Sequence, residues 1–462
     1  MQPAFLRESI MSRTDKMKFA ELLVLKKDIE TVVREIGKAG VFQFVTTAAD
    51  NLNQPDNINK DENNKIEAVI AALECTKYAY RIIGWIPESE VSAFLQLLEN
   101  AAQGRISLTV YEPFEVPSVI NSASMNSVPG SELEVPVRLS HGKFLRSFER
   151  MIFSYGAPEY GAVDPTPFVA VFFTLLFGIM FGDFGQGLFF LLFGILMAAK
   201  LIKAGGWSKF APIFMVIGIS SSVMGFLTGE IFGIEAPWKP LIHLMPSSDP
   251  KSIYVMFGVF GAAVAFGFVI NSIGLILNFI NSFLQKKYAE ALLGKNGFAG
   301  ALFFWYTVAL ILRIVLFKHN PVVYDWCVLG VSLFFAAFAE PFERKLNGEK
   351  KLFENGFGTY LISGVVELIE VFSGYLSNTV SFVRVGAFAL SHAVLNFTVL
   401  TLTELVGGPL SVAGIPILIL GNALIIVLEG MIVAIQVIRL QYYEFFSKFF
   451  HETGREFKPF KI

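Results

Sequence analysis

The chain has 462 residues, of which 54% are hydrophobic and only 16% are charged, and its formal net charge is −2. This composition is too apolar for one large soluble core and indicates a protein that crosses a membrane several times. The balanced charge and the lack of basic, aromatic-interleaved patches exclude nucleic acid as an expected partner.

Motifs for nucleotide, metal and cofactor binding are missing from the sequence. No G-x-x-x-x-G-K-[ST] segment occurs, so we expect no catalytic ATP site in this chain. The five histidines lack the spacing of metal ligands, and neither a metal nor a cofactor is expected. Residues 1–20 contain no apolar run, which predicts that there is no cleavable signal peptide and that the N-terminus stays in the cytoplasm.

The first third of the chain has the pattern of a small cytoplasmic α/β (α+β) domain over residues 17–112, preceded by an extension over residues 1–16. Two βαβ-like halves are expected to share one mixed sheet. Residues 46–64 are rich in Asn and Asp and predict a solvated linker between the halves. Residues 113–164 contain helix-breaking prolines and glycines and predict a connector. The expected strands cover 17–25, 41–45, 78–85 and 105–111, and the expected helices cover 27–38, 67–77 and 88–101.

The remaining residues, 165–462, are predicted to form an all-α transmembrane domain of eight helices, because eight apolar segments there approach or exceed the length needed to cross a bilayer. The last two segments are the longest. A continuous helix over residues 361–402 would be roughly 60 Å long, about twice the hydrocarbon thickness, so it must tilt steeply or project from the membrane. The eight segments cover about 167–181, 184–203, 210–233, 253–284, 297–317, 322–340, 361–403 and 411–449.

The distribution of basic residues predicts the orientation in the membrane. Ten basic residues lie in the loops after the second, fourth and sixth segments, and three lie in the loops on the other side. The positive-inside rule therefore places both termini in the cytoplasm. The ten are Lys200, Lys203, Lys209, Lys286, Lys287, Lys295, Arg344, Lys345, Lys350 and Lys351, and the three are Lys239, Lys251 and Lys318.

An arginine set deep inside an apolar segment is the most informative single residue. Arg384 lies 14 residues after Glu370 and 20 before Glu404, so its side chain cannot easily reach either membrane surface. An arginine cannot shed its proton in a protein, and a charge at a bilayer centre costs about 2.5–3.5 kcal/mol on insertion scales. Arg384 therefore needs a partner or a wet cavity, and its depth favours a functional role over a structural one.

Polar residues recur at seven-residue intervals in both of the long C-terminal segments. On a helix this spacing drifts by only about 20° per step, so each set forms a narrow polar stripe. Two facing stripes suggest an ion path. The first stripe contains Glu370, Ser377, Arg384 and Ser391; the second contains Asn422, Glu429, Gln436 and Tyr443, with Arg439 one turn beyond Gln436.

Two other acidic residues have simpler explanations. Met180–Gly187 (MFGDFGQG) predicts a tight, glycine-rich turn between two helices, with Asp183 at the surface in a structural role. Glu230 lies near a helix end and fits an interfacial position.

For the acids of the stripes, two interpretations stay open. Glu370 and Glu429 fit helix pairing as well as they fit ion conduction, because intramembrane ions pair for stability as well as for transport. His392 likewise fits a buried histidine that is hydrogen-bonded to a backbone carbonyl.

Several motifs resemble the subunit a family (subunit I in prokaryotes) of rotary V-type ATPases and ATP synthases. The resemblance covers nearly all of residues 17–462, and the two C-terminal motifs are the most specific. It implies eight membrane helices, the last two long and tilted, beside a rotating ring of proteolipid c subunits. The motifs are SNTVSFVRVGAFALSHAVL, LEGMIVAIQVIRLQYYEFFSKFFHETGREFKPF, DPTPFVAVFF, MFGDFGQG, LILNFINSF, YAEAL, EPFERKLNG and GWIP.

The resemblance also implies roles for residues. Arg384 matches the essential arginine that faces the ring carboxylate, and Arg439 matches the second arginine on the final helix. Glu370, His392, Glu429 and Gln436 match polar positions that line two aqueous half-channels, and Ser377 and Ser391 share the first stripe. The implied partners are the c-ring, the peripheral stalk, the subunit that joins the ring to the central stalk, H⁺ or Na⁺, and the lipid of a prokaryotic plasma membrane.

The chain departs from the family where a long coiled-coil arm with a distal lobe normally joins the two α/β halves, since only the Asn-rich linker stands there. Two other classes remain open. A secondary transporter or channel would use the same buried charges, but it predicts internal repeats that the segments lack. A purely structural scaffold leaves Arg384 without a purpose. The sequence does not distinguish H⁺ from Na⁺, or ATP synthesis from hydrolysis.

Overall fold

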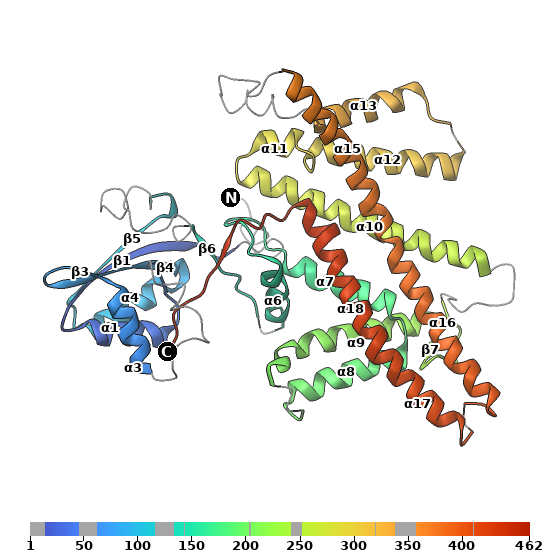
Figure 1. The fold of residues 1–462 in the computed structure, drawn as a ribbon, viewed down its shortest axis with the longest axis horizontal. Helices are drawn as coiled ribbons and strands as arrows, with labels where there is room; N and C mark the ends of the chain where they lie inside the picture. The colour runs from blue at the N-terminus through green and yellow to red at the C-terminus, as the bar shows by residue number, and fades with distance from the viewer. Residues whose placement is uncertain are drawn as a thin grey trace, which may run out of the picture. The chain divides into compact units, whose positions relative to one another are not determined.

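The computed structural model describes residues 14–45, 62–115, 134–142, 144–202, 205–241, 252–318, 320–337, 357–409 and 411–462. The chain divides into two compact units (Figure 1). The first unit contains Met1–His141, Ile152–Asp164 and His451–Ile462. The second contains Gly142–Met151 and Pro165–Phe450.

The first unit is built on a sheet in which every pair of neighbouring strands is antiparallel. The strand order is β2-β4-β1-β5, with β3 also paired to β4. Each βαβ-like half therefore has its two strands separated by a strand from the other half, a split βαβ arrangement. The expected mixed sheet was wrong for this reason. The strands are β1 (Met17–Leu25), β2 (Gln43–Phe44), β3 (Glu74–Cys75), β4 (Ala79–Pro87) and β5 (Ile106–Tyr111).

Three helices accompany the sheet: α1 (Ile29–Ala39), α3 (Glu62–Ala72) and α4 (Val91–Ala101). Helix α1 buries an apolar stripe and ends at Gly40, whose left-handed conformation (φ 61°) disfavours other residues. Helix α3 begins at Glu62, inside the range expected for the linker, and most of that linker lies outside the described residues. The main core of the unit includes Leu22, Val32, Ile36, Phe42, Ile82, Phe94 and Leu98.

The last residues of the chain belong to the first unit, whereas we expected the transmembrane domain to run to residue 462. Strand β9 (Arg455–Glu456) pairs in parallel with β6 (Pro136–Val137). Beyond it, Phe460 is buried against Phe44, with ring centroids 5.4 Å apart, and its backbone N–H donates to a core carbonyl at 2.9 Å. Burial of this aromatic ring draws the tail into the α/β core.

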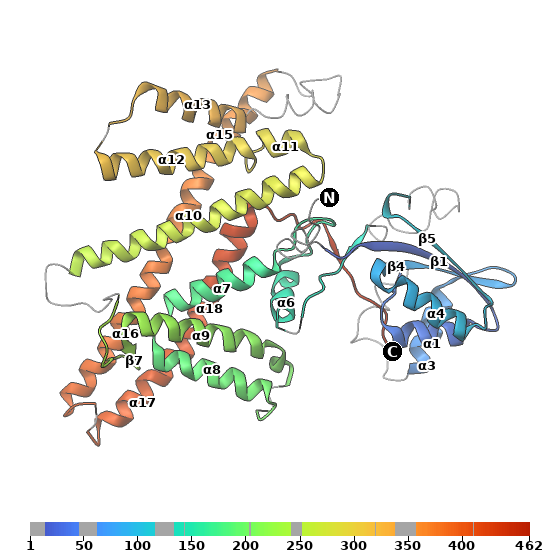
Figure 2. The same ribbon diagram turned by 180° about the vertical axis from the view of Figure 1, so that it is seen from behind.

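The second unit is helical, and each of the eight expected segments contains a helix. Among the described residues, five helices are long and apolar enough to cross a membrane and three apolar helices are shorter, so the count of eight crossings stays a prediction. Helix α10 lies between the α12–α13 hairpin and the α7–α9 group (Figures 1 and 2). The helices are α6 (Arg146–Tyr155), α7 (Thr166–Met180), α8 (Phe184–Ala198), α9 (Ala211–Thr228), α10 (Ser252–Leu284), α11 (Tyr288–Leu293), α12 (Phe298–Phe317), α13 (Val323–Ala337), α15 (Phe357–Ser381), α16 (Val383–Leu405), α17 (Gly414–Leu424) and α18 (Gly430–Arg439). A short hairpin of β7 (Glu230–Ile231) and β8 (Ile234–Glu235) follows α9.

Neither of the two C-terminal segments is one uniform α-helix. The first turns at Phe382, between α15 and α16, although we expected a helix throughout. Phe382 is fully buried and packs on α10 at Gly267, where a Cβ atom would meet the ring at 2.3 Å. The second contains two π-helical stretches, Ile425–Glu429 and Leu440–Phe445, and such stretches are common at functional sites.

Candidate functional site

The two arginines of interest lie near the same buried carboxylate. Arg384 is the second residue of α16 and is half-buried, and Arg439 is the last residue of α18 and is exposed. Both act electrostatically on Glu444, which is 4% exposed and accepts a hydrogen bond from the Ser381 hydroxyl. The buried Nη1 of Arg384 makes no hydrogen bond within the described residues. The structure thus adds Glu444, which the sequence analysis did not single out.

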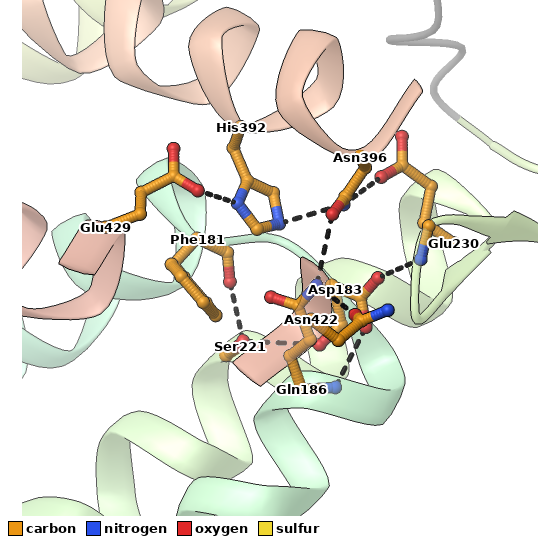
Figure 3. A network of polar contacts seen from close by, with 10 residues as sticks. Phe181, Asp183, Gln186, Ser221, Glu230, His392, Asn396, Asn422 and Glu429 are labelled. Carbon is orange, nitrogen blue, oxygen red and sulfur yellow. Dashed lines mark hydrogen bonds and ion pairs between the residues drawn. The ribbon is translucent and has the colours of Figure 1, made fainter. Parts of the chain in front are cut away.

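A histidine–glutamate pair connects the two C-terminal segments. Nδ1 of His392 on α16 lies 2.7 Å from Oε2 of Glu429, and both side chains are buried. An ionised Glu429 carboxylate only accepts hydrogen bonds, so beside it Nδ1 carries the proton and Nε2 of a neutral ring is left as an acceptor. Nε2 lies 3.2 Å from Nδ2 of Asn396, one turn further along α16 (Figure 3). The two ring nitrogens of His392 therefore have distinct roles.

Asp183 lies in this neighbourhood and is fully buried, so the expected surface position was wrong. Its Oδ1 accepts the backbone N–H of Gln186 at 2.9 Å, which caps α8, and that of Phe232 at 3.0 Å. Its Oδ2 accepts the N–H of Gly233 at 2.9 Å. Asp183 thereby joins the turn between α7 and α8 to the β7–β8 hairpin, and these backbone bonds replace the water that the carboxylate has lost.

A chain of amides extends the network. Nε2 of Gln186 donates to Oδ1 of Asn396 at 3.0 Å and to Oδ1 of Asn422 at 2.8 Å. Nδ2 of Asn396 donates to Oε2 of Glu230 at 3.3 Å. Glu230 was expected at an interface but is only 3% exposed. Figure 3 shows Glu230 beyond Asn396, on the side away from Glu429.

This buried cluster carries an excess of acidic groups. Asp183, Glu230 and Glu429 contribute three carboxylates. Within the described part of the chain, His392 is the one basic side chain that forms an ion pair or a charge contact with them. Buried charges are costly unless they are paired or bind a cation. Protons, other cations or water are therefore needed to satisfy the cluster.

A second polar cluster lies around Glu370, at the N-terminal end of the first polar stripe. Glu370 is exposed and forms an ion pair with Lys295 at 2.9 Å. Both line a pocket of about 230 Å³ with Lys448, whose Nζ lies 4.1 Å from the centre of the Tyr375 ring. The rest of the lining comes from Asn296, Val371, Gly374, Tyr375, Asn378, Tyr443 and Ser447.

The other predicted residues are dispersed. Ser377 and Ser391 are exposed on α15 and α16. Gln436 on α18 is half-buried, and its Oε1 accepts no hydrogen bond within the described residues. The seven-residue spacing therefore does not place all of its members in one contact network, because the turn at Phe382 interrupts the first stripe.

Sequence reasoning missed most of the buried cluster because its members come from four separate segments. Asp183, Gln186 and Glu230 precede the long C-terminal segments by more than a hundred residues. The one available signal was the rarity of acids near apolar helices, which is a general indication of function.

Comparison with known families decides the assignment. A family model described as "V-type ATPase 116kDa subunit family" matches residues 9–235 and 339–462, most of the chain. The chain belongs to this family. The match includes all the elements that contribute to the buried cluster, and with the five long apolar helices it makes this family member an integral membrane protein.

Individual relatives agree with the family assignment. "V-type ATP synthase subunit I 2" of Treponema pallidum is 38% identical over 287 residues, which is 58% of this chain and 61% of that protein. "A-type ATP synthase subunit I" of Methanocaldococcus jannaschii is 28% identical over 418 residues, 84% of this chain and 55% of that protein. The protein of the same name from Archaeoglobus fulgidus is 25% identical over 426 residues, covering 83% of this chain and 59% of its own length. The chain thus spans between half and two thirds of the length of these relatives.

Proposed function

We propose that this chain is the membrane stator subunit of a rotary V-type ATPase or ATP synthase. It passes H⁺ or Na⁺ through two half-channels beside a proteolipid c-ring and thereby couples ion flow to rotation. ATP hydrolysis or synthesis takes place on other subunits. The observation that carries the proposal is the presence of two separate polar clusters on either side of Arg384.

The spacing of these clusters fits two offset half-channels. His392 follows Arg384 by eight residues, and Glu370 precedes it by fourteen. At 1.5 Å per residue these positions lie roughly 12 Å and 21 Å from the arginine, in opposite directions along the helical segment. An ion that enters at one cluster must pass the level of Arg384 to leave at the other.

Arg384 supplies the electrostatic barrier between the half-channels. A fixed guanidinium favours the ionised form of an approaching carboxylate, so a ring site gives up its ion before it passes. The same positive charge repels a free cation and prevents a direct leak. Arg439, at the end of α18, adds a second positive charge near the same buried Glu444.

The surface of the last segment suits contact with a ring of apolar helices. Large apolar side chains recur on one face at helical spacing, and the row ends near Arg439. We assign this face to the c-ring. Its residues and exposed fractions are Leu420 (71%), Leu424 (55%), Val427 (65%), Met431 (55%) and Ile435 (53%).

The first unit is assigned to the cytoplasm of a prokaryotic cell, where it holds the peripheral stalk and approaches the subunit that caps the ring. Both termini then lie on the cytoplasmic side of the plasma membrane. This agrees with the excess of basic residues in the loops after the second, fourth and sixth apolar segments. In this chain a short segment stands where the family has a coiled-coil arm with a distal lobe. The α/β domain itself then provides the contact with the peripheral stalk.

Replacement of Arg384 by lysine tests the proposal. Arg384→Lys keeps a positive charge but loses the planar, weakly hydrated guanidinium, and a lysine can deprotonate when buried. ATP-driven ion transport by the reconstituted complex is expected to fall to background, with assembly intact. The matched control is Arg313→Lys, the same change at an intramembrane arginine that pairs with Asp325, which should retain transport. Normal ion transport by Arg384→Lys would overturn the proposed role of Arg384 as the barrier between the half-channels.

A further inference from the structure

The buried cluster has the donor set of a transition-metal site. One side-chain ligand atom from each of Asp183, Glu230 and His392 lies within 4.8 Å of the others, and all three residues are buried. The three come from the turn before α8, the hairpin after α9 and the first half of α16. We infer that these residues form a Zn²⁺ site.

Asp183 and Glu230 each keep a free oxygen lone pair, and the lone pair of His392 Nε2 meets only the long contact from the Asn396 amide. Glu429 fixes the proton of His392 on Nδ1, which leaves Nε2 as the ligand atom, in the carboxylate–histidine–metal arrangement. Nε2 lies 3.2 Å from Nδ2 of Asn396, and a metal ion would displace this long contact. Oδ1 of Asp183 accepts two N–H groups, but Oδ2 accepts only one and keeps a free lone pair. Oε2 of Glu230 accepts only the weak 3.3 Å bond from Asn396.

Independent evidence for a cation comes from the charge of the cluster and from an unsatisfied side chain. Three buried carboxylates face one histidine, and no lysine or arginine forms an ion pair with them among the described residues. Gln186, bonded to both Asn396 and Asn422, is fully buried, yet its Oε1 has no hydrogen-bond donor there. A divalent ion with a bound water would offset the charge and could supply that donor.

The donor types select the metal class. Imidazole nitrogen with carboxylate oxygens suits Zn²⁺ and its analogues, whereas Na⁺, Mg²⁺ and Ca²⁺ prefer oxygen ligands alone. Tetrahedral Zn²⁺ with bonds of about 2.0–2.1 Å needs donor atoms roughly 3.4 Å apart. The side chains of Glu230 and His392 would close in by about 1 Å, since the backbone bonds hold Asp183.

Occupation of this site would have a consequence for transport. His392 and Glu429 belong to one proposed half-channel, so a bound Zn²⁺ would immobilise the groups that relay the ion. This inhibitory effect rests on the proposed function, whereas the binding of the metal does not.

The test uses Zn²⁺ with the purified full chain in detergent. Equilibrium dialysis should give one tight site per chain, and His392→Gln should weaken it about 100-fold or more through loss of the imidazole ligand. Glu429→Gln should weaken it about 10- to 100-fold, the usual effect of a residue that orients a metal-bound histidine. His141→Gln, at another buried histidine–carboxylate pair (His141 to Asp164, 2.8 Å), is the control and should bind as the wild type does.

X-ray absorption of the Zn²⁺-loaded wild type keeps the test decisive if a variant fails to fold. One imidazole with oxygen ligands supports the site. Sulfur ligands from Cys75 or Cys327, the absence of a stoichiometric site, or unchanged binding by folded His392→Gln would overturn it. If the reconstituted complex binds Zn²⁺ and its ATP-driven transport is undiminished, the metal site is supported. The same result would contradict the assignment of His392 and Glu429 to a half-channel.

Discussion

At the residue scale, the fold satisfies its intramembrane charges in different ways. Asp325 is fully buried, but it forms an ion pair with Arg313 and accepts a hydrogen bond from the Tyr306 hydroxyl at 2.6 Å. Lys448 lies against an aromatic ring, a favourable position for a desolvated cation. Arg384 lacks a comparable closed pair, since its Nη1 has no acceptor within the described residues. Incomplete pairing fits the proposed role of Arg384 as a gate that meets a passing carboxylate.

An ion pair in the first unit gives a pH-dependent prediction. Nε and Nη2 of Arg105 donate to the two carboxylate oxygens of Asp28 at 3.2 and 3.1 Å, and this hydrogen bonding lowers the pKa of Asp28 below its ordinary value of 3.8. A depressed pKa in the folded state means that the contribution to stability is present above the ordinary value and is lost as pH falls through the folded value.

Hydrogen exchange of the full chain measures this contribution. Asp28→Asn should speed exchange in α1 and β5 at pH 6, after correction for intrinsic rates. The difference from wild type should shrink as the pH falls below 3.8 and through the lowered pKa of Asp28 in the folded chain. The effect is small because the pair lies near the surface. A difference that persists unchanged at acid pH would show that Asp28 acts through something other than its charge.

At the element scale, contact between α10 and α16 sets the position of Arg384. Phe382 lies two residues before the arginine and packs on Gly267 without space for a side chain. Gly386, two residues after the arginine, likewise lies close to Phe260 of α10: a Cβ atom at this position would lie 3.0 Å from the ring. Small residues at helix contacts let backbones approach closely inside a membrane. The arginine is therefore positioned by packing on both sides.

Insertion of one methyl group tests this contact. Gly267→Ala should push Phe382 away, lower stability by about 1–3 kcal/mol as overpacking does, and reduce ion transport by displacing Arg384. The control is Gly261→Ala in the same helix, where a Cβ meets nothing within 4 Å. Thermal unfolding in detergent and transport by the reconstituted complex are the measurements. Equal behaviour of the two variants would refute the positioning role.

At the scale of the whole molecule, the C-terminal tail joins the last membrane segment to the core of the first unit. The tail adds strand β9 and places Phe460 in the α/β core, and its Lys458 N–H donates to Oε1 of Gln43 at 2.9 Å. The first unit is thus assembled from the beginning, the middle and the end of the chain.

Loss of the buried ring should weaken the whole first unit. Phe460→Ala is expected to cost about 3–5 kcal/mol, the usual range for removal of a buried phenylalanine. Faster hydrogen exchange in α1 and β2 would register the change. Lys458→Ala is the control, because its exposed side chain forms only a surface ion pair with Glu456 at 3.5 Å. Unaltered exchange in Phe460→Ala would mean that the tail contributes little.

The two native cysteines report the orientation of the molecule. Cys75 in β3 and Cys327 in α13 are both free and exposed. With Cys327 replaced by serine, a membrane-impermeant maleimide should label Cys75 in inverted vesicles and leave it unlabelled in right-side-out vesicles. Permeabilised vesicles of both kinds provide the control for reactivity. Labelling of Cys75 from outside intact cells would place the first unit on the opposite side from the one predicted.

The sequence by itself determined the apolar segments and the positions of β1, β2, β4 and β5, because these depend on local composition, but residues 74–75, inside an expected helix, form β3. The role of Arg384 stays a prediction that rests on the cost of a charge in lipid. It also predicted His392 and Glu429 as polar positions of interest. Tertiary structure alone decided that these two form a pair and that Asp183 and Glu230 lie beside them. Contacts between residues in different elements, far apart along the chain, leave no periodic trace in the sequence. The same reason explains the antiparallel sheet and the burial of Phe460, since both arise from segments that meet only when the chain has folded.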